Sequence, residues 1–176
     1  MKHTTRILTL STLMLSLIAC SSTMIAPVVA QAITVPAGHQ LVMMAIGSGE
    51  LTYQCKEKST MAGAFEWAFV GPNAVLTDKN SMTVGKYYPG PTWEANDGSK
   101  VTGKQLAVSP GNAGAIPLQL VKANPSSGAG AMSDISYIQR LNTVGGVAPS
   151  ESCATDNLGA KKMVKYQADY LFYKAT

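Results

Sequence analysis

An alternation of apolar and polar side chains near the end of the chain constrains its fold most. Apolar residues stand at every second position from Val164 to Phe172, and most residues between them are charged or amide side chains. Successive side chains of a β-strand point to opposite faces, so this segment predicts a strand with one buried face. No long window after the first thirty residues shows the spacing of an amphipathic helix, which indicates an all-β fold.

Shorter runs of the same kind predict about nine short antiparallel strands in all. Besides the last one, they are expected at 40–46, 50–55, 64–70, 74–77, 83–88, 100–109, 117–122 and 135–142. Clusters of glycine, proline and asparagine separate them and predict turns at 47–49, 71–73, 96–98, 110–112 and 145–146. We therefore expect one all-β domain, either a β-sandwich or a partly closed β-barrel.

The first residues are typical of an export signal. Lys2 and Arg6 precede a run of 13 uncharged residues that ends at Ala19, directly before Cys20. The run is too short for a membrane-spanning helix, which needs about 20 residues, but it fits the apolar region of a secretory signal. Leu-Ile-Ala-Cys at 17–20 resembles the lipobox of bacterial lipoproteins, and this resemblance implies lipid attachment to Cys20 after cleavage.

This resemblance predicts a signal peptide at 1–19, a flexible tether at 20–32 and one domain at 33–176. Ser21 is not the aspartate that retains such proteins at the inner membrane, so an outer-membrane anchor facing the periplasm is expected. The alternative is an ordinary signal cut after Ala30 or Ala32, which would make the protein periplasmic or secreted. Both alternatives predict export.

Charge argues against a nucleic-acid partner. The chain has 14 basic and 10 acidic residues, and loss of Lys2 and Arg6 with the signal leaves 12 and 10. A net charge of about +2 on scattered residues provides no phosphate-binding patch. We therefore expect no nucleic-acid binding.

Three cysteines are present, and lipid on Cys20 would account for one of them. Cys55 and Cys153 can then pair in only one way, and an oxidising compartment favours that disulfide. The alternative is two unpaired buried thiols.

The densest group of candidate site residues lies in one segment that ends at Lys100. Aromatic rings beside carboxylates can bind a small molecule or a glycan, so this group is a possible ligand site. Its alternative role is structural, with a hairpin turn at 96–99 and the rings in the core. The candidate residues of this segment are Tyr87, Tyr88, Trp93, Glu94 and Asp97.

Glu94 and Asp97 are also the one pair in this segment that could serve as the two carboxylates of a hydrolase. Arg140, the sole arginine after the signal, is a further candidate for ligand binding. Its alternative role is a structural ion pair with Asp134 or Asp169.

Motifs for cofactors and metals are missing from the sequence. His39 is the single histidine after the signal, and no phosphate-binding loop, dinucleotide fingerprint or haem attachment motif occurs. We therefore expect no cofactor and no metal site.

Several longer motifs resemble the domain of unknown function family numbered 3455, found in secreted bacterial and fungal proteins. They include VPAGHQLV at 35–42, VGKYYPGPTWEANDGSKV at 84–101, SYIQRLNTVGGVAPSESC at 136–153 and YQADYLFYK at 166–174. The resemblance extends from about residue 33 to residue 174 and implies a single all-β extracytoplasmic domain. It implies no catalytic residues. Members often have histidine where this chain has Tyr87, and tryptophan where it has Leu118.

These observations favour an exported envelope lipoprotein that acts as a non-enzymatic binding or structural module with an unidentified ligand. The partners expected are the membrane, through the lipid, and a small molecule or glycan. The alternative is an extracytoplasmic enzyme of the hydrolase type that uses the segment 87–100.

Overall fold

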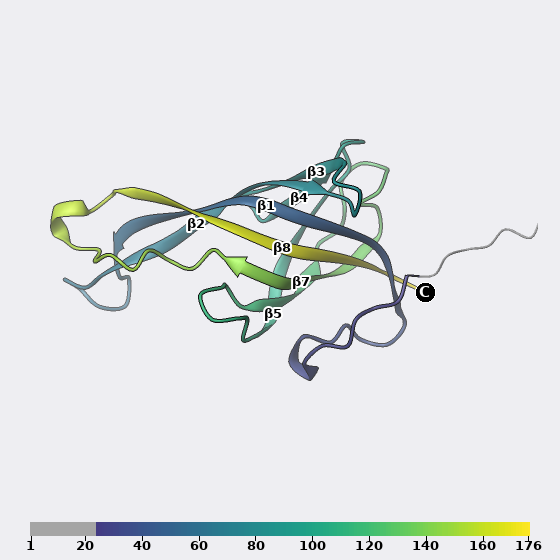
Figure 1. The fold of residues 1–176 in the computed structure, drawn as a ribbon, viewed down its shortest axis with the longest axis horizontal. Coiled ribbons are helices and arrows are strands. Elements are labelled where there is room, and N and C mark those ends of the chain that lie inside the picture. Colours follow the sequence, from purple (N-terminus) through teal and green to yellow (C-terminus); the bar gives the residue numbers. More distant parts are fainter. Residues whose placement is uncertain (1–23) are drawn as a thin grey trace, which may run out of the picture.

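The computed structural model describes residues 24–176, which form a single antiparallel sheet closed into an uneven ring of eight strands (Figure 1). The signal segment and the lipid attachment expected on Cys20 lie outside the described residues. The two long strands, β1 and β8, pair along most of their length, from His39–Ala175 to Gln54–Lys161, and this ladder closes the ring. The strands are β1 (His39–Glu57), β2 (Phe65–Thr77), β3 (Thr83–Tyr88), β4 (Thr92–Ala95), β5 (Lys100–Ser109), β6 (Leu118–Ala123), β7 (Ile135–Gly145) and β8 (Lys161–Ala175).

The all-β prediction is confirmed, and of the two expected architectures the ring agrees with a barrel rather than a β-sandwich, but the number and lengths of strands differ from the expectation. The segments 40–46 and 50–55 are one strand, β1, and the segments 64–70 and 74–77 are also one strand, β2. The turns expected at 47–49 and 71–73 are therefore wrong. The four-residue strand β4 was not expected. It lies within the segment 87–100, which was interpreted as a possible ligand site or as core residues beside a hairpin turn at 96–99.

The glycines of β1 do not form a turn; they allow neighbouring groups to pack closely against the strand. A Cβ added to Gly47 would lie 2.6 Å from the ring of Tyr170, and one added to Gly49 would overlap the backbone of Asn73 on β2. Only glycine allows another group to approach a strand this closely. A glycine pair in a strand sequence therefore looks like a turn although the strand continues.

The interior of the ring contains the main hydrophobic core. Trp93, Tyr170, Phe172, Leu76 and Ile138 are fully buried there. Because β8 alternates strictly, Tyr170 and Phe172 point inward, and the residues between and after them point outward. The alternation in the last strand thus correctly predicts its core face.

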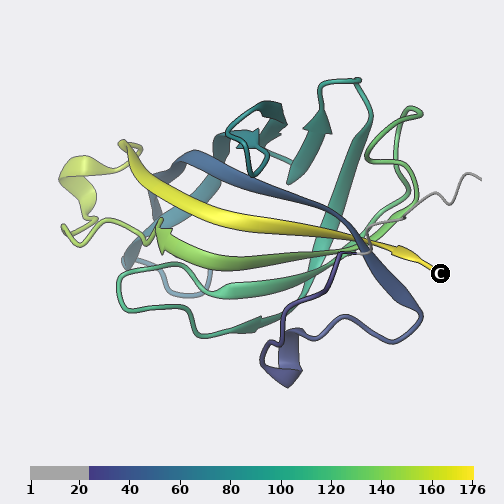
Figure 2. The same cartoon turned by 45° about the vertical axis from the view of Figure 1, so that its right-hand side comes forward.

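A second hydrophobic cluster lies on the outer face of the ring. It packs Leu41, Leu120, Leu141, Leu171 and Tyr173 against Ile33. Residues 24–38 fold back beneath the sheet and carry the short 3-10 helix η1 (Gln31–Ile33) against this face (Figure 2). The outer face of β8 is therefore apolar near its end, and the N-terminal segment covers part of it.

Two buried side-chain hydrogen bonds hold this covering segment in place. Gln139 on β7 donates its Nε2 hydrogen to the carbonyl of Ile33 at 2.7 Å, and Tyr173 donates its hydroxyl hydrogen to Gln139 Oε1 at 2.6 Å. Both polar groups are satisfied away from water, so these bonds specify where Ile33 docks.

The loop between β7 and β8 contains a second 3-10 helix, η2 (Thr155–Asn157), and is tied to β1 by a disulfide. Cys55 and Cys153 are bonded with their Cα atoms 5.4 Å apart, which confirms the predicted pairing.

Candidate functional site

Strand alternation divides the residues of the segment 87–100 between the two faces of the sheet. Strands β3 and β4 pair Tyr87 with Trp93 and Lys86 with Glu94. Tyr87 and Trp93 point into the ring, and Tyr88 and Glu94 lie on the outer face. The candidate residues therefore do not form one surface.

The inward pair belongs to an aromatic cluster. The rings of Tyr87 and Trp93 stack with their centroids 4.6 Å apart, and Tyr170 lies 5.1 Å from Tyr87 and 5.6 Å from Trp93. Trp93 is 1% exposed. Burial raises the pKa of the Tyr87 hydroxyl, so this group stays neutral. These rings are packed against one another and present no open platform for a sugar on the outer surface.

The outward pair forms an ionic cluster. Tyr88 donates its hydroxyl hydrogen to Glu94 at 2.7 Å, and the ammonium groups of Lys86 and Lys100 lie 3.4 and 3.2 Å from the same carboxylate. The hydrogen bond from Tyr88, with those from the two lysines, lowers the pKa of Glu94. Glu94 is therefore held ionised by three neighbours.

Asp97 organises the turn between β4 and β5. Its carboxylate accepts hydrogen bonds from the backbone N–H of Ser99 at 2.9 Å, from the Ser99 hydroxyl, and from the backbone N–H of Ala131 at 2.8 Å. The Ser99 hydroxyl is the largest cause that lowers the pKa of Asp97. The turn at 96–98 was predicted correctly, and Asp97 links it to the loop before β7.

The two carboxylates lack the property that a hydrolase pair requires. A general acid needs a raised pKa so that it carries a proton near neutral pH. The pKa values of Glu94 and Asp97 are both lowered. These lowered pKa values therefore do not support the hydrolase interpretation of the segment.

Arg140 donates hydrogen bonds from Nε and Nη2 to the carbonyl of Pro117, at 3.2 and 2.9 Å. These bonds do not go to Asp134 or Asp169, the carboxylates expected as its partners. Arg140 lines one cavity together with Tyr87 and Trp93, so three of the six candidate ligand-binding residues do meet.

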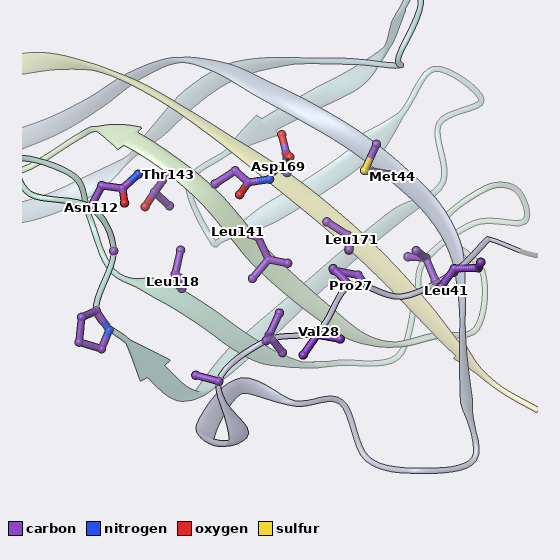
Figure 3. Close-up of a pocket in the computed structure, with 16 residues that line it drawn as sticks. Pro27, Val28, Leu41, Met44, Asn112, Leu118, Leu141, Thr143, Asp169 and Leu171 are labelled. Carbon is purple, nitrogen blue, oxygen red and sulfur yellow. Dashed lines mark hydrogen bonds between the residues drawn. The ribbon is translucent and has the colours of Figure 1, made fainter.

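A groove lies on the outer face, between the sheet and the N-terminal segment (Figure 3). Its volume is about 550 Å³, within the usual range of small-molecule sites. Leu118, Leu141 and Leu171 line it, together with Leu41 and Met44 of β1. Met44 is 40% exposed, so apolar surface is accessible to a ligand in this groove.

The end of the groove away from the N-terminal segment is polar. Asn142 has a left-handed backbone with φ 48°, a conformation that asparagine tolerates, where the pairing of β7 with β8 is interrupted. Its Nδ2 donates to Asp169 Oδ2 at 2.7 Å. Asn112 and Thr143 complete this end of the groove (Figure 3).

Residues from Ile25 to Ala30 form the remaining wall. Val29 packs against the outer cluster, whereas Ile25 and Val28 are almost fully exposed. The segment that was predicted as part of a tether thus contributes side chains to the groove wall.

Sequence reasoning missed this groove because its residues come from five separate parts of the chain, 25–30, 41–44, 110–118, 141–143 and 169–171. The sequence feature that could have indicated the groove is a set of leucines at outward positions of the strands, namely Leu41, Leu118, Leu141 and Leu171. An outer face of a barrel is normally polar, so several outward leucines indicate a covered or ligand-binding surface.

Two features are absent from residues 24–176. No group of three or more histidine, cysteine, aspartate or glutamate side chains in this range could hold a metal ion. Within the same range no helix has the length and hydropathy needed to span a membrane.

Comparisons with known proteins agree with the motifs quoted above. Residues 36–174 match the family model described as "Protein of unknown function (DUF3455)". Searches of the curated proteins and of the solved structures return no significant match. The matched range covers all eight strands except the last residue of β8, so the chain belongs to the DUF3455 family.

Proposed function

We propose that this protein is a non-enzymatic binding module of the bacterial cell envelope that holds a small amphipathic molecule in the outer groove. The observation that carries the proposal is the composition of the groove, with apolar side chains along its length and polar groups at one end. An apolar body would be desolvated against the leucines, and a polar head would reach Asn112, Asn142 and Asp169.

The charge of the polar end indicates the type of head group. Asp169 is the only charged residue among those that line the groove. A head group that donates hydrogen bonds, above all an ammonium group, would pair with this carboxylate, and an anionic head group would be repelled.

We expect octylamine to raise the unfolding temperature of the protein more than octanol, and octanoate to have the smallest effect. A ligand at 100 times its dissociation constant stabilises the folded state by about 2.7 kcal/mol, which corresponds to about 5–10 °C for a domain of this size. Asp169→Asn should remove the preference for the amine, because the amide can still accept from Asn142 but carries no charge. Thermal unfolding measurements with the three probes test this order.

Met44→Trp provides the steric test, because the larger ring would fill the groove and remove the stabilisation by octylamine. Met163→Trp is the matched control, since Met163 is an exposed methionine of β8 that lies outside the groove. Equal stabilisation by octanoate and octylamine, or equal effects of the two tryptophan variants, would contradict the proposal.

The envelope location rests on the signal segment and the lipobox-like motif before Cys20. The Cys55–Cys153 disulfide is consistent with an extracytoplasmic location. Lipid on Cys20 would anchor the chain to the outer membrane only a few residues before the wall of the groove at Ile25. An amphipathic ligand would then be bound close to the membrane surface.

Cys20→Ala is expected to release the protein from the membrane fraction or to block its processing, because the thiol that accepts the lipid is lost. Fractionation of cells and mass spectrometry of the mature N-terminus measure both effects. The wild-type protein should begin with an acylated cysteine. A mature N-terminus at Gln31 or Ile33 would show that an ordinary signal peptidase cleaves the chain and that no lipid is attached.

A further inference from the structure

A second cavity, which we call the inner cavity, is lined by residues of β2 to β7, with inward-facing core residues at its base and the exposed Lys104 at its rim. Its volume is about 420 Å³. Tyr87, Trp93 and Val121 belong to the core, and Arg140 follows the fully buried Ile138 by two positions on the same face of β7. Phe69 and Val70 are exposed where they border it, so the cavity connects the interior with the surface.

The charge of the inner cavity is opposite to that of the outer groove. Lys104 and Arg140 both line it, and none of its lining residues is acidic. The two hydrogen bonds to the Pro117 carbonyl fix the guanidinium in position and leave other N–H groups of Arg140 free to bind. An arginine held in this way is preorganised for a carboxylate or phosphate.

The indole N–H of Trp93 is a buried donor that has no partner. Trp93 lines the inner cavity, and its Nε1 is the single buried side-chain polar atom within residues 24–176 for which no hydrogen bond is found. A buried donor without a partner destabilises the folded state by about 1–3 kcal/mol. An unsatisfied donor at a binding cavity is explained if a ligand supplies the acceptor.

Tyrosine hydroxyls extend the polar lining of the interior. The hydroxyls of Tyr166 and Tyr170 lie 3.3 Å apart, and Tyr170 is adjacent to Tyr87. Burial raises the pKa of Tyr166 to about 12, and the positive charge of Arg140 opposes this rise. The hydroxyls therefore remain protonated, and the guanidinium is near enough for its charge to act on them.

We propose that the inner cavity is a second binding site, specific for a small organic anion whose carboxylate or phosphate group pairs with Arg140 and Lys104 and accepts a hydrogen bond from Trp93. The aromatic and aliphatic walls require an apolar body beside the anionic group. This site is separate from the outer groove, so its existence does not depend on the function proposed for that groove.

The indole signals in ¹H–¹⁵N spectra of the full chain provide the test. The chain has two tryptophans, Trp67 and Trp93, and a Trp67→Phe variant assigns the two signals. Benzoate and phenyl phosphate are the probes, and benzyl alcohol is the uncharged control of similar size. We expect both anions to shift the Trp93 signal downfield in a saturable way while the Trp67 signal stays in place, because Trp67 already donates to the carbonyl of Glu151.

The relative affinities of the two probes identify the anionic group, carboxylate or phosphate. The proposal is overturned if the Trp93 signal does not move up to about 10 mM of either anion, a range that detects millimolar binding. It is equally overturned if benzyl alcohol shifts the signal as strongly as the anions do.

Lys104→Gln tests the role of charge without disturbing the core, because Lys104 is exposed. We expect about fivefold weaker binding of the anion, the change typical of one exposed ion pair. The matched control is Lys79→Gln, which removes an exposed lysine from the loop between β2 and β3. Equal weakening by the two variants would show a general effect of net charge and would contradict a specific site.

Discussion

Loss of the Cys55–Cys153 disulfide is expected to lower the free energy of unfolding by about 4 kcal/mol, because it frees a loop of nearly a hundred residues in the unfolded chain. The two cysteines are 98 positions apart.

The reduced protein should nevertheless retain its fold. Cys55 exchanges backbone hydrogen bonds with the loop that contains Cys153, since its N–H donates to Ala160 and its carbonyl accepts from Gly159, both at 2.9 Å. The ladder between β1 and β8 also closes the ring without help from sulfur. We therefore expect a less stable but native-like barrel rather than an unfolded chain.

Urea unfolding with and without a reductant measures the effect, and the Cys55→Ala/Cys153→Ala double variant provides an independent comparison. The reductant should have no effect on this variant, and Cys20→Ser should leave the response of the protein to the reductant unchanged. If the unfolding midpoint of the wild type does not change on reduction, either the unfolded chain is already compact or the disulfide is strained, and the loop-entropy argument fails.

The sequence could predict those features of the fold that depend on neighbouring residues. Alternation from Val164 to Phe172 depends on the geometry of one strand, and the structure buries this face as expected. The pairing of Cys55 with Cys153 followed from counting, once Cys20 was assigned to lipid. Neither inference required knowledge of which strands are neighbours.

Features that depend on distant contacts were not predictable in the same way. Gly47 and Gly49 are needed because Tyr170 and the backbone of β2 approach them, and neither contact is visible in the local sequence. The merging of two predicted strands into β1 has this cause, and in β2 Gly71 is approached in the same way by Pro89, whose ring lies 2.6 Å from the position of an added Cβ. Leu41, Leu118, Leu141 and Leu171 form one groove only because β1, β6, β7 and β8 are adjacent in the closed sheet.

The candidate ligand-binding residues also show that the local sequence does not predict which residues meet in the folded protein. Tyr87, Tyr88, Trp93 and Glu94 are close in sequence, but successive positions on a strand face opposite sides of the sheet. The segment therefore divides into a buried aromatic cluster and an exposed ionic cluster. Arg140, more than forty residues away, shares the inner cavity with Tyr87 and Trp93, a grouping that no local motif indicates.

Trp93 is expected to be the most sensitive single position of the core. Its ring contacts Tyr87, Tyr170 and Phe172, with centroids 4.6, 5.6 and 6.5 Å away. Trp93→Ala would leave a large cavity among these rings and should lower the free energy of unfolding by about 3–5 kcal/mol. Urea unfolding followed by circular dichroism measures this change without depending on the tryptophan signal.

Trp93→Phe should have a far smaller effect, within about 1 kcal/mol of the wild type, because removal of the unpaired N–H offsets the contacts that the smaller ring loses. Trp67→Phe is the matched comparison, since it removes an indole N–H that is bonded to Glu151 at 2.9 Å. The two variants thus separate the contribution of ring size from that of the N–H group. If Trp93→Phe is as destabilising as Trp93→Ala, the N–H of Trp93 must be hydrogen-bonded in the free protein, and its contribution to the inner cavity would have to be rejected.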